Sequence, residues 1–204
     1  MNLQPLPEHP LRLLHLGDSY TIGEGVEKDG AWPGHFRNLL QARGNRIEEF
    51  ITIAKTGWTT ADLLEAVREA DPPSGWDLIT LCIGANNQYQ DSSIQEYKAE
   101  LRQLIDSSRS LLSSPQGQIC LLSIPDWSVT PFAEDRDRAA VRSQLNLFNN
   151  AGKQIARDHA IPFLDWTALT RQFRFHKDAY IEDGLHPNSL QHKAWAEFLL
   201  QQFE

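Results

Sequence analysis

Short apolar runs alternate along the chain with longer segments in which apolar residues recur every three or four positions. The short runs are typical of β-strands. They lie at residues 12–16, 46–54, 76–83, 119–124 and 161–164. The third run, Trp76–Ile83, is rich in apolar residues, as expected for a strand buried on both faces of a sheet. The second run has a mixed pattern, but the five together predict a sheet of five strands.

The longer segments predict amphipathic helices, because residues spaced by three or four lie on one face of a helix. These segments cover residues 32–43, 60–70, 94–112, 139–159 and 191–203. Regular alternation of strands with helices indicates a parallel sheet with helices on both faces. The predicted fold class is therefore α/β, a three-layer α/β/α sandwich with a five-stranded parallel sheet.

The connections between these elements favour one strand order. Right-handed crossovers and the adjacency of consecutive elements favour the order 2-1-3-4-5 of flavodoxin-like folds. In that order the first strand lies between the second and the third. The polar residues that follow these three strands then meet at one edge of the sheet, and they include Ser19, Gly57 and Asn86. No linker or internal repeat divides the chain, so one domain over residues 1–204 is the simplest interpretation.

Composition and charge narrow the range of partners. The chain has a formal net charge of -8 and no basic stripe, which argues against a nucleic-acid partner. The first ten residues lack the basic start and apolar segment of a signal peptide, and no run reaches the length of a membrane span. We therefore expect a cytoplasmic protein without a stable membrane anchor. Cys82 and Cys120 lie in apolar runs, and we expect both to be buried free thiols.

The clearest candidate for chemistry follows the first strand, where Gly17-Asp18-Ser19 forms a tight turn. We predict that Ser19 is a nucleophile and that Asp18 holds the turn through hydrogen bonds. A serine hydroxyl is a weak nucleophile near neutral pH, so it needs a histidine to accept its proton and a carboxylate to orient that histidine. Asp183 and His186 are separated by two residues and suit these roles. A buried Asp183 would fix the tautomer of His186 and stabilise its charged form.

The reaction of a nucleophilic serine with an acyl group also develops negative charge on the carbonyl oxygen. Hydrogen-bond donors must stabilise that oxyanion. The sequence offers the backbone N–H groups of Ser19 and Gly57 and the side-chain amide of Asn86. All three follow strand ends. We therefore expect them to form an oxyanion hole beside the nucleophile.

Four segments carry a resemblance to a known family. They are, in order, Gly17-Asp18-Ser19, Gly57, Gly84-Ala85-Asn86 and Asp183-Gly184-Leu185-His186-Pro187. Their order and content resemble the SGNH hydrolase superfamily, also called GDSL-type esterases. The resemblance implies a serine nucleophile, a Ser-His-Asp triad, the same three oxyanion donors and an α/β/α sandwich. The implied activity is hydrolysis of a carboxylic ester or thioester through an acyl-enzyme, as in esterases, lipases and lysophospholipases.

Two positions depart from the family pattern. Tyr20 stands where the family motif has leucine, and Asn87 replaces the aspartate that commonly follows the asparagine. Neither belongs to the catalytic set, but the residue after the nucleophile helps to shape the pocket. Trp58, Tyr89 and Trp127 follow strand ends and are further candidates, for which packing in the core or at the rim is an equal alternative. Candidate substrate-pocket residues are therefore Tyr20, Trp58, Asn87 and Trp127.

Other interpretations use the same residues. Gly-Asp-Ser alone is more often an ordinary turn, and Asp-x-x-His alone is usually a surface pair, so the argument depends on their combination. An acyltransferase or a carbohydrate deacetylase would use the same site. A flavodoxin-like module that binds phosphate or flavin is disfavoured, because the loop after the first strand has no phosphate-loop lysine. We expect a small-molecule acyl ester or thioester as partner and no metal or organic cofactor.

The remaining histidines are assigned structural or solvent-exposed positions. Among the seven histidines, only His186 lies near an acidic residue in a loop that can reach the site. His15 falls within the first strand and is expected in the core. The others are expected to be solvated: His9, His35, His159, His176 and His192.

Overall fold

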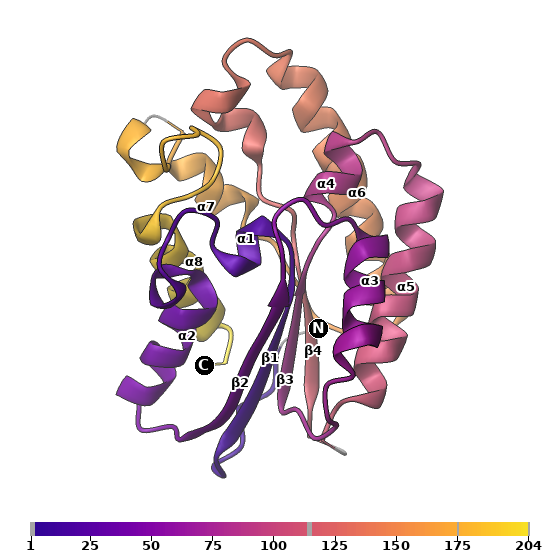
Figure 1. Cartoon of the computed structure of the whole chain (residues 1–204), viewed down its shortest axis with the longest axis vertical. Helices are drawn as coiled ribbons and strands as arrows, with labels where there is room; N and C mark the ends of the chain where they lie inside the picture. Colours follow the sequence, from indigo (N-terminus) through magenta and orange to yellow (C-terminus); the bar gives the residue numbers. More distant parts are fainter. Residues whose placement is uncertain (1–2, 114–115, 175, 204) are drawn as a thin grey trace.

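The computed structural model describes residues 3–113, 116–174 and 176–203, and its centre is a parallel sheet (Figure 1). The strands are β1 (Leu11–Gly17), β2 (Ile47–Ala54), β3 (Leu78–Cys82), β4 (Gln118–Leu122) and β5 (Phe163–Leu164). Their order is β2-β1-β3-β4-β5 and every pairing is parallel. The predicted strand order and fold class are confirmed.

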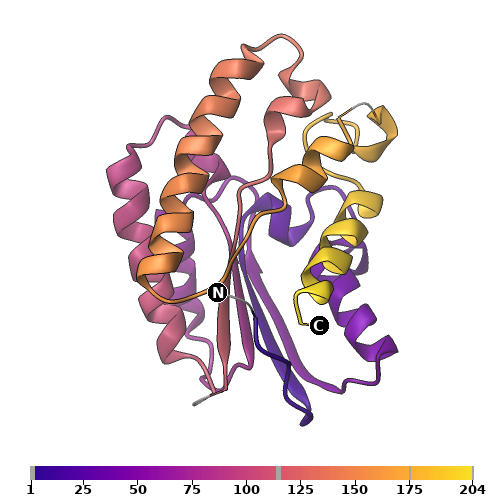
Figure 2. The ribbon, with the colours of Figure 1, turned by 180° about the vertical axis from the view of Figure 1, so that it is seen from behind.

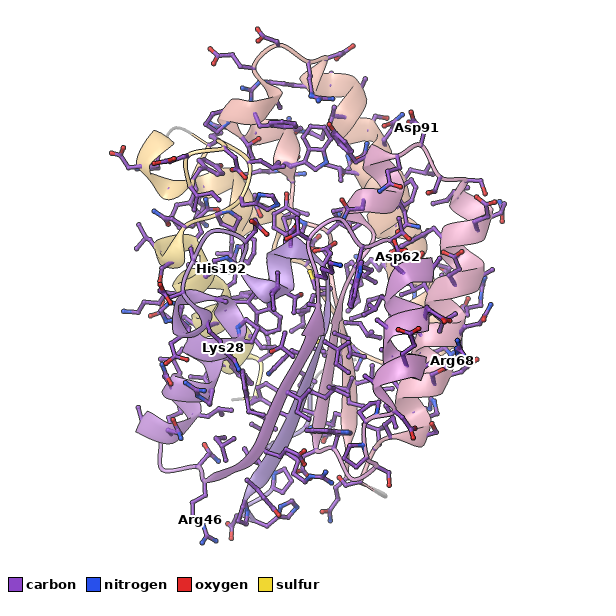
Figure 3. All side chains as sticks on the ribbon, in the orientation of Figure 1. Lys28, Arg46, Asp62, Arg68, Asp91 and His192 are labelled. Carbon is purple, nitrogen blue, oxygen red and sulfur yellow. The ribbon has the colours of Figure 1, made fainter. Side chains whose placement is uncertain are left out.

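Helices cover both faces of the sheet. One layer contains α2 (Trp32–Ala42) and α8 (Ser189–Gln201), and the opposite layer contains α3 (Thr60–Ala70), α5 (Ile94–Ser110) and α6 (Arg138–Asp158). Figures 1 and 2 show the two layers from opposite sides. Charged side chains at the surface, such as those of Arg46, Asp62 and Arg68, point outward (Figure 3). The predicted three-layer arrangement is therefore confirmed.

The apolar patterns follow from the positions of the strands in the sheet. β3 lies between β1 and β4, and all of its residues are buried. β2 is an edge strand and most of its residues are half-buried, which explains its mixed pattern. On the α2 and α8 side, the rings of Trp166 and Trp195 stack with centroids 4.7 Å apart, and Trp32 contacts Trp166 edge-on. Large aromatic side chains therefore fill this half of the core.

Several short elements have no counterpart in the sequence pattern. They are α1 (Ser19–Ile22), α4 (Ala85–Tyr89), α7 (Thr167–Gln172) and the 3₁₀ turns η1 (Lys28–Gly30), η2 (Trp127–Val129), η3 (Pro131–Ala133) and η4 (Lys177–Ala179). Elements of three to six residues are too short to show a helical period. Two of them matter for the site, because α1 follows β1 and α4 follows β3. Both therefore begin at the carboxyl end of the sheet.

The buried histidines and cysteines test the remaining structural expectations. Cys82 and Cys120 are buried and free, as predicted. His15 is in the core as predicted, with Nδ1 2.8 Å from Oγ1 of Thr80. The expectation that His192 is solvated is wrong: it is fully buried on α8 (Figure 3) and contacts Trp195 edge-on. An amphipathic helix has one inward face, and His192 lies on it beside the apolar residues.

Among the helices in the described part of the chain, none combines the length and the apolar character that crossing a membrane requires.

Candidate active site

Ser19 is held at the end of β1 by a turn with little free space. β1 ends at Gly17, where an added Cβ would lie 2.2 Å from Oγ1 of Thr21 and 2.5 Å from the carbonyl oxygen of Cys82. Only glycine fits such a close approach. Asp18 then caps α1, and its carboxylate accepts the backbone N–H of Tyr20 at 3.0 Å. The expectation that Asp18 holds this turn is confirmed, and Ser19 follows as the first residue of α1.

The carboxyl group of Asp18 is itself in an unusual environment. It is buried beside Ser19, and burial raises the pKa of Asp18 to about 7, although the hydrogen bond from Tyr20 favours the charged form. A carboxyl group with such a pKa is largely protonated in mildly acidic solution. Asp18 therefore differs from Asp183, the acidic residue of the Asp183–Pro187 segment, in its protonation as well as in its position.

His186 and Asp183 lie in a loop that closes against itself between Tyr180 and Pro187, which form an isolated antiparallel bridge. Nδ1 of His186 donates to Oδ2 of Asp183 at 2.6 Å. The other carboxylate oxygen accepts the backbone N–H groups of Leu185 at 2.8 Å and of His186 at 2.9 Å. The carboxylate therefore fixes both the loop and the orientation of the imidazole.

Asp183 differs from the expected buried carboxylate. Its side chain is 40% exposed, whereas that of His186 is 11% exposed, because the loop lies at the surface and Asp183 approaches the ring from the solvent side. Partial burial raises the pKa of Asp183, but hydrogen bonds from the His186 side chain and the two backbone N–H groups outweigh it, so the net shift is downward. Asp183 is therefore ionised at neutral pH, as a partner of a histidine base should be.

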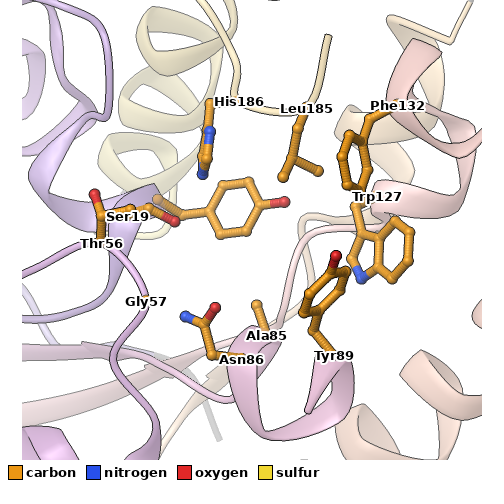
Figure 4. Close-up of a pocket in the computed structure, with 11 residues that line it drawn as sticks. Ser19, Thr56, Gly57, Ala85, Asn86, Tyr89, Trp127, Phe132, Leu185 and His186 are labelled. Carbon is orange, nitrogen blue, oxygen red and sulfur yellow. The ribbon is translucent and has the colours of Figure 1, made fainter. Parts of the chain in front are cut away.

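The imidazole of His186 points toward Ser19 (Figure 4). Because Nδ1 is bound to Asp183, Nε2 is the nitrogen that remains for a proton from the pocket. Both residues line the same pocket. Ser19 itself is 5% exposed and lines that pocket.

The residues with the predicted oxyanion donors, Ser19, Gly57 and Asn86, all lie on one side of the pocket (Figure 4). Gly57 follows β2 with φ of +87°, and an added Cβ would meet nothing within 4 Å, so backbone conformation and not space favours glycine here. Asn86 lies on α4, and its Nδ2 donates to the carbonyl oxygen of Trp58 at 2.9 Å. That bond fixes the amide and uses one of its two N–H groups.

The pocket has a volume of about 200 Å³. Its lining residues come from five separate parts of the chain: Ser19, Tyr20, Thr56, Gly57, Ala85, Asn86, Tyr89, Trp127, Phe132, Leu185 and His186. Four of them were not predicted. Ala85 and Leu185 belong to the recognised segments and Thr56 adjoins Gly57, which is the signal that could have identified them. Phe132 has no such neighbour in the sequence.

One side of the pocket is an aromatic wall made of Tyr89, Trp127 and Phe132. The ring centroids of these residues lie 5.8 to 6.4 Å apart. The indole N–H of Trp127 donates to Oε1 of Gln88 at 2.8 Å. The guanidinium of Arg136 lies within 4.8 to 5.7 Å of all three ring centroids and donates to the hydroxyl of Tyr89 at 3.1 Å. These contacts hold the wall in one arrangement.

Of the four predicted pocket residues, Tyr20 and Trp127 line the pocket, whereas Trp58 and Asn87 do not. Trp58 packs against the core, and its carbonyl oxygen supports Asn86. Asn87 is buried, accepts the backbone N–H of Thr60 at 2.9 Å and donates to its Oγ1 at 2.8 Å. Successive helical residues point about 100° apart, so Asn86 and Asn87 on α4 face different surroundings.

The described residues offer few ligands for a metal ion near this pocket. Asp183 and His186 are bonded to each other. Among residues 3–113, 116–174 and 176–203, no three His, Cys, Asp or Glu side chains come together as a metal site would require.

Comparison of the sequence with known proteins gives two related matches. The sequence model of the GDSL-like lipase/acylhydrolase family matches residues 15–194. The isoamyl acetate-hydrolyzing esterase 1 homolog of Mus musculus is 24% identical over 187 residues, which span 86% of this chain and 74% of the mouse protein. The segment that the family model matches, residues 15–194, contains Ser19, Gly57, Asn86, Asp183 and His186.

Comparison with solved structures finds the same fold in bacterial esterases. The acetylxylan esterase Axe2 from Geobacillus stearothermophilus has a TM-score of 0.72 and 22% identity, covering 100% of this chain and 96% of that one. The psychrotrophic esterase EstA from Pseudoalteromonas sp. has a TM-score of 0.69 and 17% identity, covering 94% of this chain and 95% of that one. These similarities extend over nearly the whole length of the chain and show a shared fold.

Proposed function

The chain belongs to the GDSL-like lipase/acylhydrolase family and is an ester hydrolase, and from this premise we propose that it acts through a covalent acyl-enzyme formed on Ser19. The observation that carries the proposal is the orientation of His186. Its Nδ1 is held by Asp183 at 2.6 Å, and its ring points toward Ser19 (Figure 4). A histidine held in this way can accept the serine proton on Nε2.

In the first half of the proposed reaction, Oγ of Ser19 attacks the ester carbonyl carbon while its proton moves to Nε2 of His186. The carbonyl electron pair becomes the oxyanion of a tetrahedral intermediate. When the intermediate collapses, the bond to the alcohol oxygen breaks, and the alcohol leaves with the proton of His186. In the second half, water attacks the acyl-enzyme, its proton passes through His186, and Ser19 is released with the carboxylic acid. Asp183 stabilises the charged imidazole in both halves.

Three donors are proposed to bind the oxyanion. The backbone N–H groups of Ser19 and Gly57 donate to no residue that the structure describes, so both are free for a ligand. The second N–H of the Asn86 amide is the third donor, because the first is bound to Trp58. Donors fixed before the reaction stabilise the transition state without a reorganisation cost.

The proposed substrates are short-chain esters, acetates above all. A pocket of about 200 Å³ holds a small substrate better than a long acyl chain. The mouse relative is named for hydrolysis of isoamyl acetate, and a structural neighbour is an acetylxylan esterase. Two forms of that neighbour, with a serine or a histidine replaced by alanine, are described as catalytic mutants. Removal of acetyl groups from a carbohydrate is therefore the second candidate activity, and family membership disfavours a non-catalytic binding module.

The proposal is tested by turnover measurements on Ser19→Ala and His186→Ala with a panel of esters. The panel contains p-nitrophenyl acetate, isoamyl acetate, acetylated xylooligosaccharide and an acyl-CoA thioester. We expect kcat to fall by about 10⁴-fold or more in each variant, because the nucleophile and its base act as a unit. Circular dichroism serves as the control for folding. A folded Ser19→Ala enzyme with turnover within tenfold of the wild type would contradict the proposal.

A further inference from the structure

Tyr20 carries a hydroxyl group that the proposed reaction does not use. The residue lines the pocket and is only 4% exposed. Its hydroxyl forms no hydrogen bond with any residue that the structure describes, and it is not one of the polar atoms that the fold seals from solvent. A polar group in a buried setting is costly without a partner. The partner of this hydroxyl must therefore enter through the pocket.

The position of Tyr20 is fixed on several sides. Its backbone N–H donates to Asp18, and its ring lies 5.6 Å from the ring of His186 and 6.1 Å from that of Trp195 between centroids. Burial raises the pKa of Tyr20 well above its ordinary value, and the nearby charge of Asp18 adds to this shift. The hydroxyl therefore stays protonated and can both donate and accept a hydrogen bond.

The other polar side chains of the pocket have partners or roles already. Ser19, Asn86 and His186 belong to the proposed reaction. The hydroxyl of Thr56 donates to Glu24. The indole N–H of Trp127 is bound to Gln88, and the hydroxyl of Tyr89 accepts from Arg136. Among the described lining residues, Tyr20 thus carries the one buried side-chain hydroxyl that has neither a protein partner nor a role in the proposed reaction, whereas Tyr89 is 48% exposed.

We propose that the hydroxyl of Tyr20 binds an oxygen atom of the substrate that lies outside the ester group. The substrate class is then a short-chain ester whose alcohol or acyl part carries an ether or hydroxyl oxygen. A hydrocarbon ester of the same length would cover the hydroxyl without replacing its hydrogen bond to water, which lowers affinity. Sites that contain a buried hydrogen-bonding group discriminate against substrates that lack its partner. This inference rests on the proposed ester hydrolysis at Ser19.

The test uses esters of equal length in which one methylene group is replaced by oxygen. On the alcohol side, pentyl acetate is compared with 2-ethoxyethyl, 3-methoxypropyl and 4-hydroxybutyl acetate. On the acyl side, ethyl pentanoate is compared with ethyl 3-methoxypropanoate. For each pair, the ratio of kcat/KM for the oxygen ester to that for the hydrocarbon ester is measured in the wild type and in Tyr20→Phe. We expect this ratio to fall by about tenfold for at least one pair, which matches one hydrogen bond.

Tyr89→Phe is the matched control, because it also removes a phenol hydroxyl from the pocket. We expect it to keep the wild-type ratio. Tyr20→Leu introduces the leucine of the family motif, and its kcat/KM ratio should fall as that of Tyr20→Phe does. Tyr20→Leu serves as the test variant if Tyr20→Phe does not fold. The proposal is overturned if every ratio is the same in the wild type and the Tyr20 variants, or if the ratio falls in Tyr89→Phe instead. Failure of the underlying esterase mechanism is distinct, because then Ser19→Ala retains turnover.

Discussion

Individual side chains in this protein have protonation states that follow from their surroundings. Asp183 is 40% exposed and yet fixed, because its two carboxylate oxygens accept three hydrogen bonds from the loop that carries it. Asp18, one residue before the proposed nucleophile, is buried, and burial raises its pKa to about 7. The sequence identified both carboxylates but assigned the buried position to Asp183. A short loop sequence does not reveal which side of a histidine the carboxylate approaches.

The sequence also did not reveal that His192 is buried, and this burial leads to a prediction about pH and stability. Burial lowers the pKa of His192 to about 3, and the nearby His35 and His186 contribute to the shift. Between that value and the ordinary pKa of about 6.5, the unfolded chain binds a proton that the folded chain does not. The contribution of His192 to stability is therefore fully present above pH 6.5. It is lost as the pH falls, by about 1.4 kcal/mol per pH unit.

The prediction is checked by urea unfolding of the wild type and His192→Phe at pH 6.5 and pH 5.5. Phenylalanine keeps a ring against Trp195 but cannot bind a proton. Between the two pH values, the free energy of unfolding of the wild type should drop by about 1 kcal/mol more than that of the variant, because the unfolded histidine is already half protonated at pH 6.5. His15, whose pKa is also lowered by burial, is present in both proteins and cancels from the comparison. Equal losses in the two proteins would show that His192 is protonated in the folded state.

Elements with a long, regular pattern could be predicted, and short elements could not. The alternation of five apolar runs with five amphipathic segments was sufficient to predict the strand order, because few topologies satisfy the rules of handedness and adjacency. α1 and α4 have only four and five residues, so their side-chain directions had to come from the structure. That is why Asn87, adjacent to Asn86, was assigned to the pocket although it faces Thr60.

The loop after β2 allows a prediction with an internal control. Gly57 and Gly44 have similar φ values, +87° and +92°, and neither position has an atom within 4 Å of an added Cβ. Alanine at either position is strained by the backbone alone, so Gly57→Ala and Gly44→Ala should each lower the free energy of unfolding by about 1 to 2 kcal/mol. Only Gly57→Ala should also lower kcat, by about tenfold or more, because the N–H of Gly57 would turn away from the oxyanion.

Ester turnover and thermal or urea unfolding of both variants provide the measurement. Gly44 follows α2 and does not line the pocket, which makes it a control for strain without a role in the site. If kcat falls equally in both variants, or in neither, the loop of Gly57 does not supply an oxyanion donor.

On the scale of the whole molecule, the site exists because the strand order brings distant segments together. β1 lies between β2 and β3, so the residues after these three strands meet at one edge of the sheet. The loop with Asp183 and His186 comes from the far end of the sequence and closes the same pocket. This convergence was predictable from motif order and topology. The aromatic wall was not, because η2 and η3 have no periodic pattern and Phe132 adjoins no motif.

The most direct test of this account is to identify the residue that a fluorophosphonate ester modifies. Such a reagent reacts with an activated serine and leaves a stable phosphonyl group on its oxygen, which peptide mass spectrometry locates. We predict stoichiometric modification of Ser19 in the wild type and a much slower reaction in His186→Ala, because the variant lacks the base that activates the hydroxyl. Modification at another residue, or equal rates in the wild type and His186→Ala, would contradict the account.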